Sequence, residues 1–255
     1  MLISVAITTG FGRQLNVSTL GFAGTGGDIL IPGFVVAGSG AKRLLIRAAG
    51  PALVAFGVAG VLTDPQLVIF SGSTQILSND NWSTEAVNAS AVRVAGAAVG
   101  AFPFTEGSKD AAVVTTLNPG GYSIQVSGVG GTTGQAIAEV YDLDAADPAR
   151  SRLVNLATRA LVQVAAGPLI SGFVEQGAVA KTVLVRAIGP TLGAFGVPGT
   201  LAQPKLTLFD SAGTDIAGNT GWESAGISDA IIAAAESVGA FALPRGSTDS
   251  VLVAV

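Results

Sequence analysis

The chain has 255 residues, of which 49% are hydrophobic and only 12% are charged, and its formal net charge is −4. It contains no cysteine and no histidine, which excludes disulfides, thiolate chemistry, imidazole general bases and the usual zinc sites. The 13 Lys and Arg residues are scattered, which disfavours nucleic-acid binding, and no apolar run reaches the roughly 18 residues of a transmembrane helix.

The sequence contains two copies of one unit. RAAGPALVAFGVAGVL begins at Arg47, and RAIGPTLGAFGVPGTL begins at Arg186, 139 positions later (186 − 47). Many other pairs share this offset, including Phe34 with Phe173 and Asp110 with Asp249. An active-site motif rarely occurs twice in a chain, whereas a building unit does, so the repeat predicts two domains of the same fold.

The N-terminal run LISVAI, at residues 2–7, is apolar and typical of a β strand. We assign residues 1–12 to this strand, 13–147 to the first repeat and 148–255 to the second. The second repeat stops before the counterpart of 117–144, so it lacks two strands. LISVAI precedes the first copy where AEVYDL precedes the second, and it therefore looks like a spare final strand.

Short β-type runs bounded by Gly, Pro, Asn and Asp dominate the first copy. They predict strands at residues 14–21, 28–37, 42–49, 66–72, 111–117, 121–128 and 136–143. Two helices are predicted, one after Trp82 and one in the second copy with Ser228 as its N-cap. The fold class is all-β: two tandem β-sandwich domains, jelly-roll or immunoglobulin-like, with short helical insertions.

The repeated phrase around Gly-Pro predicts a corner in which a buried strand ends and one helical turn begins at Pro51. Phe56 and Leu62 are expected to enter the core at this corner. Trp82 and Trp222 occupy equivalent positions, which favours a core role for both. The loops GTGGD and GSGAK lack the Walker spacing and are interpreted as hairpin turns.

Each copy places an arginine inside an apolar strand, where an unpaired charge is costly. We expect Arg47 to pair with Asp110, and Arg186 to pair with Asp249, inside each sandwich. The alternative is that both arginines reach the surface at a strand end. If the pairing holds, Arg47→Ala destabilises the fold far more than Arg43→Ala.

Oxygen-bearing side chains gather in the turn SNDNW, where Asn79, Asp80 and Asn81 are calcium candidates. The second copy reads GNTGW there, without the aspartate, so we favour an Asx turn and keep calcium binding as the alternative. No catalytic residue is proposed, because a serine hydrolase needs a positioned base and no acidic pair recurs in a cleft-forming context. We expect no enzyme activity and no cofactor, and calcium at this turn is the weaker alternative.

LNPGGYSIQVSG, at residues 117–128, resembles the core pattern of bacterial pre-peptidase C-terminal-like β-sandwich domains. The larger unit resembles repeats of very large secreted or surface proteins of environmental bacteria. The resemblance implies secreted, non-catalytic structural or accessory modules. The pattern departs from that family after Gly128, where AIAEVYDL carries Glu139 and Asp142.

These features predict a structural protein of the bacterial exterior or cell surface that forms an array or filament. Its partner is another copy of itself or neighbouring domains of a longer chain, and the N-terminal strand fills the second copy of the next subunit by β-augmentation. The assembly residues are Leu2, Ile3, Val5, Ile7, Val251, Leu252 and Val253. The alternatives are an adhesion module that binds carbohydrate or protein and an accessory domain of an enzyme.

Overall fold

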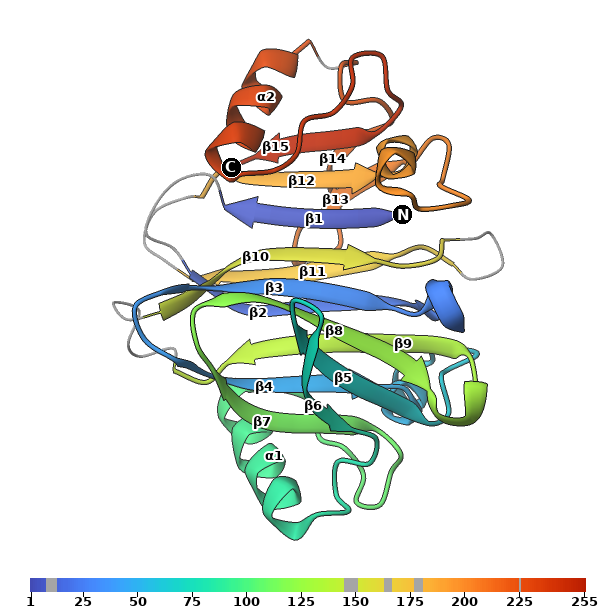
Figure 1. Cartoon of the computed structure of the whole chain (residues 1–255), viewed down its shortest axis with the longest axis vertical. Helices are drawn as coiled ribbons and strands as arrows, with labels where there is room; N and C mark the ends of the chain where they lie inside the picture. Colours follow the sequence, from blue (N-terminus) through green and yellow to red (C-terminus); the bar gives the residue numbers. More distant parts are fainter. Residues whose placement is uncertain (8–12, 145–150, 163–166, 177–180, 225) are drawn as a thin grey trace. The chain divides into compact units, whose positions relative to one another are not determined.

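The computed structural model describes residues 1–7, 13–144, 151–162, 167–176, 181–224 and 226–255 (Figure 1). The fold is all-β, and the strand pairings within each unit are antiparallel. The chain divides into two compact units. The larger unit comprises Arg13–Gln176, and the smaller one comprises Met1–Gly12 together with Gly177–Val255.

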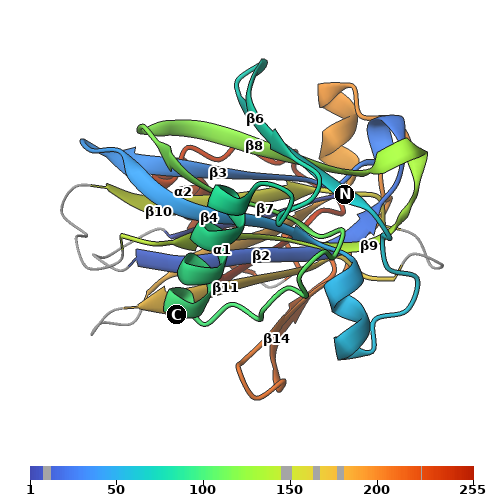
Figure 2. The same cartoon turned by 90° about the horizontal axis from the view of Figure 1, so that it is seen from below.

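The described residues of the larger unit form ten strands. They are β2 (Arg13–Ala23), β3 (Ile31–Gly38), β4 (Lys42–Ala49), β5 (Pro65–Ser71), β6 (Thr74–Asn79), β7 (Ala111–Leu117), β8 (Gly120–Gly128), β9 (Gly134–Asp142), β10 (Ser151–Arg159) and β11 (Ile170–Gln176). The order β6-β5-β8-β3-β10 forms one layer, and β11-β2-β9-β4-β7 forms the other. In Figure 2, β3 and β8 of the first layer lie on one side, and β2 and β11 of the second layer lie on the other.

Burial follows the alternation of the strands. Ile124 and Val126 of β8 point into the core with Phe34 and Val36 of β3, as their period of two predicts. β4 is buried on both faces, because helix α1 (Ala86–Val99) covers its outer face while the other layer covers its inner face. The predicted core role of Trp82 is confirmed, since it packs beneath α1.

The repeated Gly-Pro corner is a close backbone crossing. A Cβ atom on Gly50 would lie 2.0 Å from the carbonyl oxygen of Leu62, so only glycine fits there. The predicted turn at Pro51 is confirmed as the 3₁₀ helix η2 (Pro51–Phe56). Leu62 is buried as expected, but Phe56 is exposed and packs edge-on against Phe102 at 5.0 Å. The prediction for Phe56 was therefore wrong, because the turn directs its ring away from the core.

The smaller unit repeats one part of the larger one. β12 (Val183–Ile188) lies between β1 (Leu2–Ile7) and β15 (Ser250–Ala254), as Figure 1 shows. The remaining elements are η4 (Pro190–Phe195), the hairpin β13 (Leu206–Phe209) and β14 (Asp215–Asn219), and helix α2 (Ser228–Ser237). Trp222, Leu184, Ile231 and Val251 form its core beneath α2, which confirms the core role of Trp222.

The two copies exchange strands inside the larger unit. β10 and β11 begin the second copy, yet β10 pairs with β3 and β11 pairs with β2. The two registers are equivalent: Leu156 opposes Phe34 on one side, and Val17 opposes Phe173 on the other. Thr19 and its counterpart Thr158 meet at 2.8 Å between their hydroxyl oxygens. The compact units therefore have different boundaries from the two sequence copies.

Three local expectations need correction. GTGGD and GSGAK are not hairpin turns, because the strands that flank each loop belong to different layers. α2 begins at Ser228, so Ile227 rather than Ser228 is its N-cap residue. β6 was not predicted, because its residues are mostly exposed and show no alternation of apolar and polar side chains.

Candidate functional site

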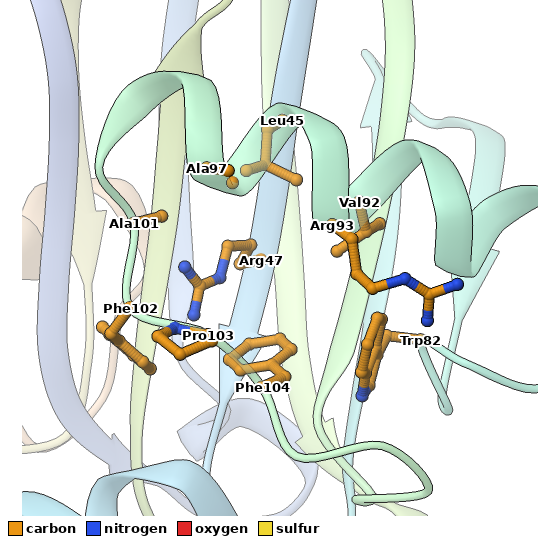
Figure 3. Close-up of a pocket in the computed structure, with 11 residues that line it drawn as sticks. Leu45, Arg47, Trp82, Val92, Arg93, Ala97, Ala101, Phe102, Pro103 and Phe104 are labelled. Carbon is orange, nitrogen blue, oxygen red and sulfur yellow. The ribbon is translucent and has the colours of Figure 1, made fainter.

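A buried arginine lies at the centre of the candidate site. Arg47 projects from β4 and is only 2% exposed. Its guanidinium is held between two aromatic rings, with its central carbon 4.2 Å from the ring centre of Phe102 and 4.0 Å from that of Phe104 (Figure 3). This arrangement orients the planar cation and offers it the electron-rich ring faces.

The carboxylate beside this arginine belongs to Glu139 on β9. Arg47 Nε lies 3.4 Å from Glu139 Oε2, and the hydroxyl of Tyr141 donates to Glu139 Oε1 at 2.7 Å. The strand register brings them together, because Arg47 and Glu139 stand opposite each other on paired strands. The sequence did not lead us to predict Glu139 as the partner of Arg47. The feature that could have indicated it is an acidic residue within an otherwise apolar strand.

Burial governs the titration of this cluster. Desolvation lowers the pKa of the Arg47 guanidinium, and the charge of Glu139 opposes that change. Desolvation also raises the pKa of the Glu139 carboxyl, against the effects of Arg47 and of the Tyr141 hydrogen bond. The pKa of Tyr141 is raised chiefly by burial. The three groups therefore form one low-dielectric cluster whose charges depend on each other.

Asp110 does not form the ion pair that was predicted for it. Its Oδ1 atom accepts hydrogen bonds from the backbone N–H of Gly50 at 2.9 Å and of Ala52 at 3.2 Å. Ser108 donates to its other oxygen at 2.7 Å. Asp110 acts on Arg47 only through space, so its main role is to fix the Gly-Pro corner. The buried arginine of the first copy is paired, but with a different carboxylate.

A cavity of about 420 Å³ opens beside the guanidinium, between α1 and the segment that follows it. Trp82 and Arg93 line one end, Arg47 and Phe102 line the other, and Figure 3 shows Phe104 between them. Arg93 lies 5.8 Å from the Trp82 ring centre. Among the described residues, Arg47 Nε and Nη2 have no hydrogen-bond partner, although Nε lies within ion-pair distance of Glu139. The cavity thus combines aromatic walls with a buried cation.

The second copy builds the same corner around Arg186, which is 3% exposed. Its guanidinium carbon lies 4.3 Å from the ring centre of Phe241, the counterpart of Phe102. Asp249 accepts hydrogen bonds from the Gly189 N–H at 2.7 Å and from the Thr191 hydroxyl. As in the first copy, the predicted direct pair with the aspartate does not form, because the aspartate is engaged by the corner.

Arg186 has no carboxylate opposite it. Ser4 of β1 occupies the register position that Glu139 holds in the first copy. Burial lowers the pKa of the Arg186 guanidinium to about 10, and Asp249 acts in the opposite direction. Arg186 Nε and Nη2 lack hydrogen-bond partners among the described residues. The same buried cation is therefore less well compensated in the second copy.

The predicted assembly residues meet on three neighbouring strands of the smaller unit. β1 pairs with β12 along its whole length, from Leu2 opposite Ile188 to Ile7 opposite Val183. β15, which contains Val251, Leu252 and Val253, pairs with the other edge of β12. Val5 and Val251 are each 1% exposed. The N-terminal strand thus completes the second copy within one chain, in the place that β9 takes in the first.

The calcium candidates surround a small hollow of about 290 Å³ at the end of β6. Asn79 is committed to the protein, since its side-chain oxygen accepts the Ala112 N–H at 3.0 Å and its amide donates to the Asn81 carbonyl. Asp80 and Asn81 line the hollow. The described residues contain no cluster of three or more acidic, His or Cys side chains that could hold a metal ion. Calcium binding stays a prediction.

In comparisons with known proteins, no family model, no curated protein and no solved structure matches this chain. The resemblance to pre-peptidase C-terminal-like domains therefore stays a prediction. In the described part of the chain, no helix has the length and apolar character that crossing a membrane requires.

Proposed function

We propose that the protein is a structural unit of an extracellular or cell-surface array in which chains are joined by exchange of β strands. The observation that carries the proposal is the reciprocal pairing of β10 with β3 and of β11 with β2 in equivalent registers. Two copies of the unit interlock by exchanging strands inside one chain. Identical contacts made between chains would extend the same construction into an array.

β1 supports a head-to-tail form of this assembly. It pairs with β12 in the register that β9 adopts on β4, so the second copy accepts a strand remote in sequence. The backbone contacts are the same whether β1 comes from its own chain or from a neighbour. This contact joins different surfaces of the two chains. When its rotation does not close into a ring, repetition of the contact produces a filament.

An uncovered strand edge is the second support. β3 pairs with both β8 and β10, whereas its counterpart β11 pairs only with β2 among the described strands. Ile170 and Val174 of β11 are 53% and 51% exposed. An apolar edge strand invites pairing with another chain, and natural proteins usually cover such edges. In the array, a neighbouring chain covers this edge.

Disulfide trapping tests the proposal, because the chain has no native cysteine. Val5 opposes Val185 on β1 and β12, and Val5→Cys/Val185→Cys places two thiols across this pair. A second variant, Ala6→Cys/Leu184→Cys, places the thiols at the next pair along the two strands. Both are needed because only alternate pairs of an antiparallel ladder have a geometry that suits a disulfide. Exchange between chains predicts a ladder of covalent multimers on a non-reducing gel, which reduction returns to monomer.

The matched control is Ile46→Cys/Val140→Cys, at the equivalent positions of β4 and β9. This pair should lock within one chain at every protein concentration. If both β1 variants also give only internally locked monomer across a dilution series, then strand donation by β1 is rejected. Electron microscopy of the unlocked protein should show fibres that disappear when residues 1–10 are deleted.

A binding or adhesion module is the second candidate, and the cavity beside Arg47 favours it. Aromatic walls and a buried cation suit a ligand with a flat face and an acceptor oxygen, such as a carbohydrate that carries a carboxylate. A glycan array tests this candidate. Binding that Phe104→Ala abolishes supports adhesion, whereas the absence of any bound glycan removes the support that the cavity offers.

A further inference from the structure

Two buried cations on β4 are each matched by an acid on β9. Lys42 Nζ lies 2.8 Å and 2.9 Å from the two carboxylate oxygens of Asp142, and both side chains are fully buried. Arg47 pairs with Glu139. The acids follow the spacing Glu-x-x-Asp, in the sequence EVYD at residues 139–142. β4 and β9 are therefore complementary in charge as well as in backbone pairing.

The second copy keeps both cations, but only Arg186 lies on β12; Lys181 stands two residues before the strand and is only half-buried. β1 carries neither acid. Lys181 and Arg186 follow Lys42 and Arg47 at the repeat offset of 139. The register places Ser4 opposite Arg186, where Glu139 opposes Arg47. It also places Ile7 opposite Val183, where Asp142 opposes Leu44. The mismatch at a buried charge is therefore that of Arg186 with Ser4, and the second position differs in the residue that β1 supplies opposite Val183.

This mismatch has an energetic consequence at Arg186. A buried guanidinium that loses its carboxylate keeps its desolvation penalty and forfeits the compensating attraction. Phe241 contacts the cation, but Nε and Nη2 remain without partners among the described residues. Ser4 is uncharged and cannot compensate the cation, so the β12 edge is better suited to a strand that carries an acid at this position.

We infer that β12 is a receptor for a Glu-x-x-Asp strand, and that the partner is another β-sandwich repeat of this type presenting a strand like β9. β1 is then the weaker occupant, which an acidic strand displaces. The inference rests on the proposed function in one respect, since it takes the β12 edge to be open to strands from outside. It adds the chemistry by which that edge selects its partner.

The carboxylate requirement is tested in the full chain, without any exchange. Ser4→Glu should raise the folding equilibrium constant about tenfold over Ser4→Gln, because both side chains fill the same space but only glutamate compensates Arg186. Urea denaturation measures the difference. In an Arg186→Met background the advantage of glutamate should vanish. Equal stability of the Glu and Gln variants in the wild-type background would overturn the inference.

Partner choice is tested with a labelled peptide of residues 134–144, which contains β9, added to the wild-type protein. It should bind about tenfold more tightly than the same peptide carrying Glu139→Gln and Asp142→Asn. A protein in which the Val5→Cys/Val185→Cys disulfide fixes a β1 strand on β12, from its own chain or from a neighbour, should bind neither peptide. Equal affinity for both peptides, or no binding of either, overturns the inference.

The outcomes separate the two ideas. Covalent multimers together with equal peptide affinities leave strand exchange standing and remove the acidic-strand receptor. If the protein prefers the acidic peptide but forms no covalent multimers, then β12 is a receptor for acidic strands and donation of β1 between chains is rejected. Each idea therefore fails on its own measurement.

Discussion

The corners around Arg47 and Arg186 are built from the same sequence phrase but differ in how they compensate a buried charge. In both, the arginine contacts a phenylalanine and an aspartate fixes the Gly-Pro backbone. Only the first has a carboxylate across the strand pair, because Glu139 faces Arg47 while Ser4 faces Arg186. The comparison shows that the scaffold of the corner is local, whereas charge compensation comes from whichever strand lies alongside.

Replacing each arginine with methionine should give the largest difference in stability between the two corners. Arg47→Met leaves Glu139 buried without its cation, and we expect a loss of about 3 kcal/mol in the free energy of unfolding. Arg186→Met removes a charge that has no paired carboxylate, so we expect little loss or a slight gain in stability. Urea denaturation of the two variants measures both values.

The control is the double variant Arg47→Met/Glu139→Gln, which should recover part of the loss because it removes the unpaired carboxylate. Equal losses in Arg47→Met and Arg186→Met would show that the ion pair with Glu139 contributes nothing beyond the aromatic contacts.

The pH dependence of Arg47→Met should sharpen the same comparison. Burial already raises the pKa of Glu139, and the loss of Arg47 removes the charge that opposes this rise. An acid with a raised folded-state pKa binds more protons in the folded than in the unfolded state between the two pKa values. Its contribution is therefore fully present below pH 4.5, the ordinary value, and is lost as the pH rises.

We therefore expect Arg47→Met to lose more than about 1 kcal/mol of stability, relative to the wild type, between pH 4 and pH 7. Thermal denaturation followed across this range checks the sign. The same series on Arg186→Met should be flat relative to the wild type, because Ser4 and Val251 rather than a carboxylate stand opposite Arg186 on the paired strands. A parallel decline in both variants would contradict the assignment to Glu139.

Much of the fold follows from local sequence patterns. β4 and β7 occupy the predicted ranges, because their apolar runs end at residues that break strands. Burial of both tryptophans follows from their equivalent positions in the repeat. The exchange of β10 and β11 between the copies could not be predicted, since equivalent strands pair equally well with either copy and sequence similarity does not choose between them.

The candidate site was predicted in part for the same reason. The sequence shows that Arg47 and Arg186 need partners, because charges inside apolar strands are expensive. It does not show which acid lies across the sheet, since Glu139 is 92 positions from Arg47 (139 − 47) and register alone brings them together. Asp110 was predicted as the partner because the aspartate recurs in both copies. Its carboxylate instead accepts hydrogen bonds from the backbone N–H groups of the Gly-Pro corner.

The tryptophans should give the smallest difference between the copies. Trp82 and Trp222 are each 1% exposed, and each indole N–H donates to a serine hydroxyl at 3.2 Å. Each phenylalanine substitution loses one hydrogen bond and part of a buried ring, so we expect about 2 kcal/mol from either. Because the surroundings recur, the two losses should agree within about 0.5 kcal/mol. A much smaller loss of stability for Trp82→Phe would mean that side chains around the cavity beside Trp82 shift to fill the space left by the indole. The two corners would then differ in packing as well as in charge.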